Sequence, residues 1–169
     1  TENDPFTQPQ VDLVRQMLEA GGVKSLYYRV YDPTTVKPGD YEKMAQNIMN
    51  TKAEIGVFGT VLPDITAFVQ TFRKSHYTKF KAVIATAGPD LGEQFVKAVG
   101  GQQNAKSIFV PNGWYPQADN YQNADMVAAY ITQYNIAANA INADVAEAYS
   151  VGQVMTQAAA KVNSFDKTK

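Results

Sequence analysis

Two apolar runs in this sequence, residues 54–60 and 82–86, each end in a bend that leads into a helical pattern. Small residues at such a bend let a ligand approach the backbone, and the first turn of the following helix offers free N–H groups to an anion. A carboxylate at such a bend could bind a cationic group of a ligand or cap the following helix. The bend after residue 86 therefore also fits a simple turn with a helix cap. The candidate binding residues at the bends are Val61, Leu62, Ala87 and Asp90.

The residue types that perform catalysis are scarce. The sequence has no cysteine and a single histidine, His76, which stands between Ser75 and Tyr77 in a polar setting typical of a solvated side chain. It contains none of the glycine-rich phosphate or dinucleotide loops and no nucleophile-elbow motif. We therefore expect a protein that is not an enzyme and that holds no cofactor or metal.

Composition describes a packed globular chain. The 169 residues fit one domain with room for an appendage, and 45% hydrophobic and 18% charged residues suit a folded core. A net charge of −1 gives no reason to expect nucleic acid as a partner. No apolar run is long enough to predict a membrane span.

The order of the predicted elements indicates an α/β fold. Strand patterns at 25–31, 54–59, 82–86 and 107–110 alternate with amphipathic helical patterns, which predicts a doubly wound parallel sheet with helices on both faces. In such a sheet ligands bind at the carboxyl ends of the strands, where the two bends lie. Helices are also expected to start at Pro9 and after an Asp40 cap.

The alternation stops at residues 114–116. Two helical patterns, 121–134 and 143–162, follow without a strand between them. We interpret Trp114–Pro116 as the point where the chain leaves one lobe for another. Trp114 and Tyr115 fit either a stacking pair in a cleft or packing at a hinge.

The sequence resembles the type I periplasmic substrate-binding proteins of ABC importers, in particular the leucine/isoleucine/valine-binding branch. The resemblance depends on the order and spacing of short motifs across nearly the whole chain. These are Asn3-Asp4-Pro5-Phe6, Gly21-Gly22-Val23, Val57-Phe58-Gly59-Thr60, Thr86-Ala87-Gly88-Pro89 and Ala148-Tyr149-Ser150.

This resemblance implies a domain organisation. Residues 1–113 would form the flavodoxin-like second lobe without its first strand, 114–116 the hinge crossover, and 117–169 the helical part that belongs to the first lobe. In the family that first strand lies centrally, between the strands at 25–31 and 54–59. We therefore expect the sequence to be an excerpt of a longer protein, with a strand supplied from upstream or from another chain.

The resemblance also implies roles for individual residues. Phe6 and Val61 stand where amino-acid binders often have aromatic side chains, which makes this half of the site more apolar than usual. Asp90 stands where such proteins have an acid that meets the ligand's ammonium group. Tyr149 lies on the helix that borders the cleft, although its helical pattern also fits a core position.

The function implied is capture of a small amino acid or an aromatic or branched carboxylate between two lobes, followed by delivery to an ABC permease. Such a receptor is periplasmic or extracellular, and a lipid anchor at a missing N-terminus would fit. A ligand-sensing regulatory or receptor domain of the same fold is the alternative, and an enzyme domain is the weakest reading. An upstream secretory or lipoprotein signal would separate the first reading from a cytoplasmic sensor.

Overall fold

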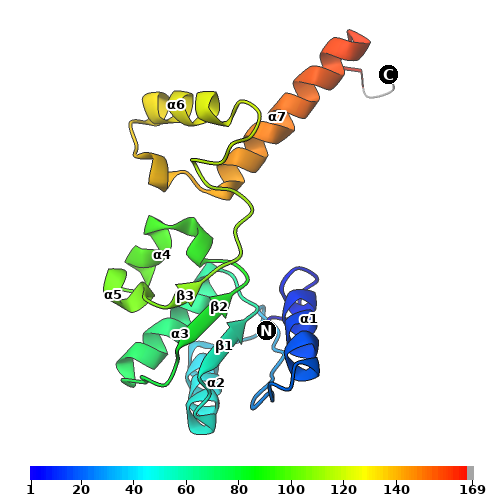
Figure 1. Cartoon of the computed structure of the whole chain (residues 1–169). Helices are drawn as coiled ribbons and strands as arrows, with labels where there is room; N and C mark the ends of the chain where they lie inside the picture. The colour runs from blue at the N-terminus through cyan, green and yellow to red at the C-terminus, as the bar shows by residue number, and fades with distance from the viewer. Residues whose placement is uncertain (167–169) are drawn as a thin grey trace. The chain divides into compact units, whose positions relative to one another are not determined.

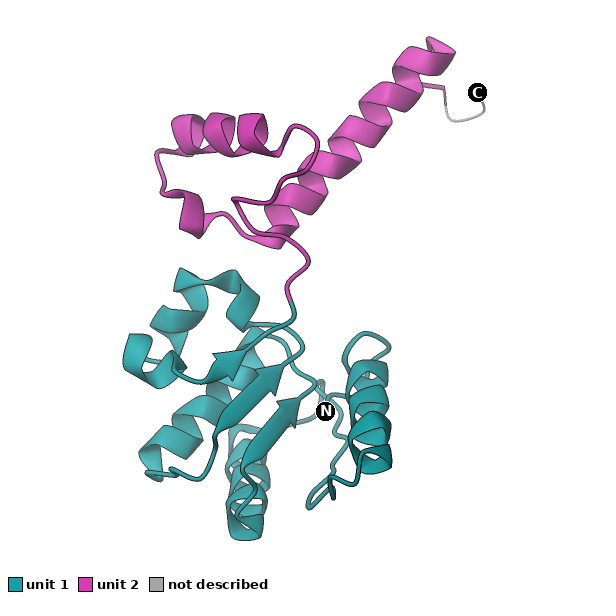
Figure 2. Ribbon diagram, in the orientation of Figure 1, with its two compact units in different colours: residues 1–111 teal, residues 112–169 magenta. Residues whose placement is uncertain are grey.

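The computed structural model describes residues 1–166 and divides into two compact units. Unit 1 comprises residues 1–111, and unit 2 begins at residue 112 (Figure 2). The unit boundary falls close to the predicted change of organisation at 114–116. The assignment of these parts to two lobes and a hinge stays a prediction.

Unit 1 is an α/β unit, which confirms the predicted fold class. Its three strands form one sheet of parallel strands in the order β1-β2-β3. In Figure 1, α1 lies on the β1 side of this sheet, and α4 and α5 lie on the β3 side. The elements are α1 (Thr7–Ala20), α2 (Pro38–Thr51), β1 (Ile55–Phe58), α3 (Leu62–Lys74), β2 (Ala82–Ala85), the 3-10 turn η1 (Pro89–Leu91), α4 (Glu93–Ala98), α5 (Gln102–Ala105) and β3 (Ile108–Phe109).

The core of unit 1 lies between the sheet and its helices. Along β1 and β2 the side chains alternate, so that Phe58, Val83 and Ala85 are buried while Ile84 is exposed. The aromatic ring of Phe68, on α3, packs 5.1 Å from that of Phe58, measured between ring centroids. This packing fixes α3, and therefore the bend that precedes it, against the end of β1.

The predicted strand at residues 25–31 is not a strand in the structure. Residues 24–30 have no regular secondary structure, and only Tyr31 forms a bridge, with Glu2. The Tyr31 N–H donates to the Thr1 carbonyl at 3.1 Å, and Glu2 N–H donates to the Gly59 carbonyl at 2.8 Å. A strand requires a neighbour along its length, and here the backbone of residues 1–3 is hydrogen-bonded to this segment at Arg29 and Tyr31, at one end of it.

Two helix starts also differ from the sequence prediction. Helix α1 begins at Thr7 rather than Pro9, because the Asp4 carboxylate accepts hydrogen bonds from the N–H groups of Phe6 and Thr7. Helix α2 begins at Pro38 with Lys37 as the N-cap, and Asp40 stands at the third helical position. The Asp40 side chain accepts from the Lys37 N–H, as an acidic residue at that position does in a capping box.

Unit 2 contains the two predicted helices, α6 (Asn123–Tyr134) and α7 (Ala143–Val162), with the short 3-10 turn η2 (Ala138–Ala140) between them. Asn142 caps α7 by accepting from the Val145 N–H at 3.2 Å. The small core of this unit consists of Trp114, Met126, Ile141 and Ala146. Within residues 1–166, no helix combines the length and apolarity that a bilayer crossing requires.

Candidate functional site

The bends after β1 and β2 are tied together by a pair of threonines. The Thr60 N–H donates to Thr86 Oγ1 at 3.0 Å, and the same hydroxyl donates to the Thr60 carbonyl at 3.0 Å. The backbone N–H of Thr86 donates in turn to the carbonyl of Phe58, two residues before Thr60, at 2.9 Å. These reciprocal bonds hold the two bends at a fixed separation at the carboxyl edge of the sheet.

Glycine at position 88 allows the second bend to reach the start of α3. Gly88 has φ +105°, a conformation that side chains disfavour. A Cβ at this position would lie 2.6 Å from Ile65 Cγ2 and 3.2 Å from Leu62 Cα. The Asp90 carboxylate accepts from the Gly88 N–H at 2.6 Å and so stabilises the turn.

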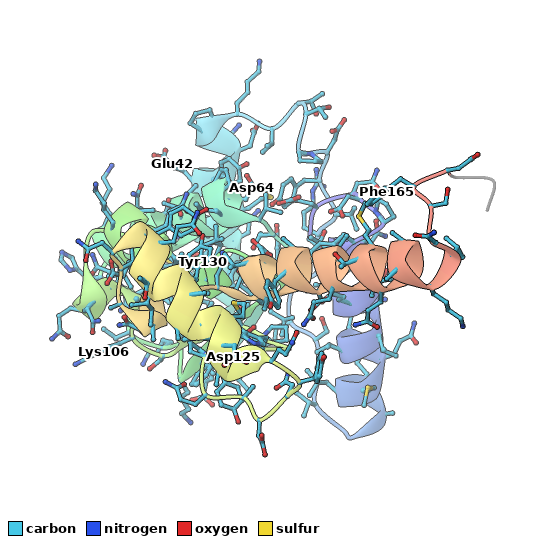
Figure 3. The ribbon with its side chains drawn as sticks, turned by 90° about the horizontal axis from the view of Figure 1, so that it is seen from above. Glu42, Asp64, Lys106, Asp125, Tyr130 and Phe165 are labelled. Carbon is cyan, nitrogen blue, oxygen red and sulfur yellow. The ribbon has the colours of Figure 1, made fainter. Side chains whose placement is uncertain are left out.

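A cluster of acidic and phenolic side chains lies behind the first bend. Asp64, in the first turn of α3, accepts hydrogen bonds from the hydroxyls of Tyr31, at 2.8 Å, and Tyr41. Glu2 enters the same cluster, and its Oε1 accepts from the Val61 N–H at 3.0 Å. Glu2 is 4% exposed and Asp64 is 7% exposed. Asp64 can be located by its label in Figure 3, which draws the side chains as sticks.

Burial and mutual contact change the protonation of this cluster. Burial, followed by a hydrogen bond with Asp64, raises the pKa of Glu2 to about 7, and the Val61 N–H opposes the change. Burial and the hydrogen bond to Asp64 also raise the pKa values of Tyr31 and Tyr41, which therefore remain neutral donors. The two hydroxyls satisfy both carboxylate oxygens of Asp64, with Tyr31 donating to Oδ2 and Tyr41 to Oδ1.

The structure brings the predicted residues of the two bends to one edge. Val61 is exposed and Leu62 half-buried after β1, and Ala87 and Asp90 are half-buried after β2. Phe6 is 58% exposed in the loop before α1. Their shared role in binding stays a prediction.

The other two predicted residues belong to unit 2. Trp114 is buried there, and its indole N–H donates to Asn123 Oδ1 at 2.7 Å. Tyr149 is 40% exposed on α7. Neither placement tests the predicted ligand contact of these residues.

A separate cavity of about 370 Å³ opens between the extended segment 25–31 and β1. Its lining includes Thr1, Tyr31, Ile55 and Phe58. None of the seven predicted ligand-binding residues lines it. The cavity lies beside the backbone groups of β1 that β2 does not pair, whereas the candidate site lies at the ends of the strands.

Sequence reasoning missed the residues that support the bends. Glu2 and Asp64 stand in a polar loop and a helix start, where acids are ordinarily solvated. Their burial depends on contacts between residues 23 to 59 positions apart. A signal was present for Thr60 and Thr86, because a threonine stands within two residues of the end of each apolar strand.

The arrangement is suited to binding without bond chemistry. The two bends present backbone groups, the side chains of Val61 and Ala87 and the carboxylate of Asp90. Among the described residues there is no group of three or more His, Cys, Asp or Glu placed to hold a metal ion.

Comparison with known proteins agrees with this description. A family model described as "Periplasmic binding protein" matches residues 1–169, and the chain belongs to this family. The family consists of extracytoplasmic, non-enzymatic solute-binding proteins. The sequence has no significant match among curated proteins.

A solved structure shows the same fold. It is the crystal structure of an amino acid ABC transporter substrate-binding protein from Pseudomonas fluorescens Pf-5, with a TM-score of 0.73 and 13% sequence identity. The match covers 98% of the present chain and 42% of the other. The present chain therefore spans less than half the length of that protein.

Proposed function

We propose that this chain is part of an extracytoplasmic receptor of the leucine/isoleucine/valine-binding branch, which binds a small amino acid or organic carboxylate and delivers it to an ABC permease. The observation that carries the proposal is the joined pair of bends at the carboxyl edge of a parallel sheet, in a chain of the periplasmic binding protein family. Ligands of open α/β sheets bind at this edge.

The predicted ligand-binding side chains of unit 1 favour an apolar ligand. Phe6 and Val61 are exposed, at 58% and 41%, and offer hydrocarbon surface. Asp90 Oδ1 accepts from the Gly88 N–H, and this single bond leaves Oδ2 available to a ligand. We assign Oδ2 to the ammonium group of an amino acid such as leucine.

Calorimetric titration of the protein expressed from its complete gene tests the proposal, with L-leucine, L-phenylalanine and benzoate as ligands. Asp90→Asn retains an oxygen for the Gly88 N–H but removes the charge. We expect it to weaken amino-acid binding by about 2 kcal/mol or more, roughly 30-fold, while leaving benzoate binding unchanged.

Asp90→Ala separates the structural part of this role. It removes the bond to Gly88 as well as the charge, and should lower stability by about 1 kcal/mol more than Asp90→Asn does. Binding of benzoate together with no binding of either amino acid would contradict the assigned ammonium contact. Binding of none of the three would contradict the ligand class, and conversion of any of them to a product would contradict a receptor function.

A further inference from the structure

The outer edge of β1 has backbone groups that the sheet does not pair. In the described part of the chain, β1 is the first strand in the order β1-β2-β3, so β2 covers only one of its edges. The Phe58 carbonyl points to β2, and the next carbonyl, that of Gly59, points away and accepts the Glu2 N–H at 2.8 Å. By this alternation the backbone groups of Ile55 and Val57 also point away from β2. They face the cavity of about 370 Å³, which both residues help to line.

The extended segment 25–31 forms the facing wall of this cavity. The Arg29 carbonyl accepts from the nitrogen of Thr1 at 2.7 Å, which defines the side to which the Arg29 backbone points. By the same alternation, the backbone groups of Tyr27 and the N–H of Arg29 face the cavity. Two backbone edges therefore face each other across it.

Residues 1–3 lie between these two edges in the manner of a strand end. Glu2 forms a parallel bridge with Tyr31 on one side, and its N–H donates to the Gly59 carbonyl on the other. Because the pairing is parallel, the chain direction backwards from Glu2 runs along β1 toward Ile55. That direction leads into the cavity.

Helices cover both faces of the space beside β1. Phe58 packs on Phe68 of α3, whereas a Cβ at the next residue, Gly59, would lie 2.9 Å from Val11 of α1. Successive residues of a strand point to opposite faces, so α1 and α3 lie on opposite sides. The apolar helix residues that line the cavity are Val11, Val14 and Leu18 of α1, Met44 and Ile48 of α2, and Phe68 of α3. A strand enclosed in this way consists of nearly continuous apolar residues.

We propose that the four residues preceding Thr1 in the complete protein occupy this cavity as a parallel strand, between β1 and the segment 25–31. Their number matches the four residues of β1. The inserted strand gives segment 25–31 the neighbour that it lacks along most of its length. The sheet of unit 1 then has five strands.

The bonds of residues 1–3 define the register of the inserted strand. The bond from Glu2 N–H to the Gly59 carbonyl places Thr1 opposite Gly59, so the residues before Thr1 lie opposite β1 in reverse order from Phe58. The Val57 N–H then donates to the carbonyl of the third residue before Thr1. The Arg29 N–H donates, on the other side, to the carbonyl of the second.

The geometry favours the chain's own upstream segment over other occupants. A small apolar molecule would leave the facing backbone donors and acceptors unpaired. A strand from a second copy would meet residues 1–3, which already lie between the same two edges. The solved structure of the same fold is more than twice as long as the present chain, which covers 42% of it.

The inserted strand also changes the role of the loop that follows it. Residues 4–6 become the bend at the carboxyl end of a strand, in the same position as the bends after β1 and β2. Glu2 Oε1 accepts the Val61 N–H at 3.0 Å, so this third bend begins beside the first. The contribution of Phe6 to solute capture rests on the proposed function, whereas the strand itself does not.

Amide hydrogen exchange followed by NMR tests the strand without any ligand, on the protein expressed from its complete gene. The reporting amides are those of Val57 and Arg29, which point into the cavity. The Phe58 amide is the internal reference, since it points to β2. We expect the protection factors of Val57 and Arg29 to lie within about tenfold of that of Phe58. Protection of either amide more than about tenfold below that of Phe58 would overturn the proposal.

Nuclear Overhauser effects from the same two amides identify the occupant. We expect them to reach the second, third and fourth residues before Thr1. Effects that appear only between labelled and unlabelled copies in a mixed sample would assign the cavity to a second copy and overturn the proposal. An absence of effects to any residue outside unit 1 would overturn it as well.

The upstream sequence provides a second check. The second and third residues before Thr1 lie in the middle of the cavity and should be apolar. A charged residue or a proline at either position would contradict the proposed strand. Absence of leucine binding in the calorimetric titration would refute the ligand class and leave these results unaffected.

Discussion

The close approach of Gly88 to the start of α3 leads to a prediction about Gly88→Ala. Two costs add at this position. The first is the backbone conformation at φ +105°, which costs a residue with a Cβ about 1–3 kcal/mol. The second is the new methyl group, which would lie 2.6 Å from Ile65 Cγ2 and 3.2 Å from Leu62 Cα, and such overpacking costs about 1–3 kcal/mol.

We therefore expect Gly88→Ala to lower the free energy of unfolding by about 2–6 kcal/mol. Ile65 is fully buried, and Leu62 Cα belongs to the backbone, so neither neighbour can yield easily. The displacement should fall on the Leu62 bend and should weaken solute binding as well as stability.

Alanine substitution of two other glycines in unit 1 allows the backbone cost to be measured separately from the packing cost. Gly101 has φ +115° but no atom within 4 Å of a built Cβ, so Gly101→Ala measures the backbone cost alone. Gly39, in the first turn of α2, has open space and no positive φ, so Gly39→Ala should be neutral or slightly stabilising.

Urea denaturation followed by circular dichroism gives the unfolding free energies of all three variants. The predicted order of destabilisation is Gly88→Ala, then Gly101→Ala, then Gly39→Ala. If Gly88→Ala cost no more than Gly101→Ala, the close packing of Gly88 against α3 would be refuted.

Three further predictions concern other polar side chains. Because the pKa of Glu2 rises from an ordinary value of 4.5 to about 7 on folding, the folded state binds the extra proton. Stability should therefore fall by up to about 3 kcal/mol as pH rises from 4.5 to 7, and urea titrations across this range should show a flatter profile for Glu2→Gln. Asn123→Ala should destabilise unit 2 by about 2–4 kcal/mol, measured by thermal unfolding, because it leaves the Trp114 indole N–H and the carbonyls of Pro116 and Ala118 without their partner; a loss below 0.5 kcal/mol would show that water replaces it. Asn142→Ala should cost about 1 kcal/mol through loss of the α7 cap, whereas Asn142→Asp should retain the stability of the wild type.

The sequence predicted those parts of the fold that depend on neighbouring residues. β1 and β2 were recognisable because apolar runs lie between bends, and α7 because its apolar positions recur with helical spacing over residues 143–162. The segment 25–31 has the residue types of a strand, but strand formation depends on a partner that lies elsewhere in the chain. A local pattern contains no information about that partner.

The candidate site was predictable to a similar extent. The positions of Val61 and Asp90 followed from the rule that ligands bind at the carboxyl ends of parallel strands. The contact of Glu2 with Val61 was not predictable, because it joins residues 59 positions apart and buries an acid. A carboxylate usually avoids such a position unless its protonation changes.

The reciprocal hydrogen bonds of Thr60 and Thr86 have a consequence for how selectivity could change. Since backbone atoms and one hydroxyl fix the two bends, the adjoining side chains of Val61 and Ala87 do not carry the structure of the edge. Substitutions at these two positions should alter which solute is accepted with little change in foldability. Because the bends are already ordered, the free energy of ligand binding does not include an entropic cost of ordering them. A designer seeking a new specificity would therefore vary Val61 and Ala87 and leave the threonines untouched.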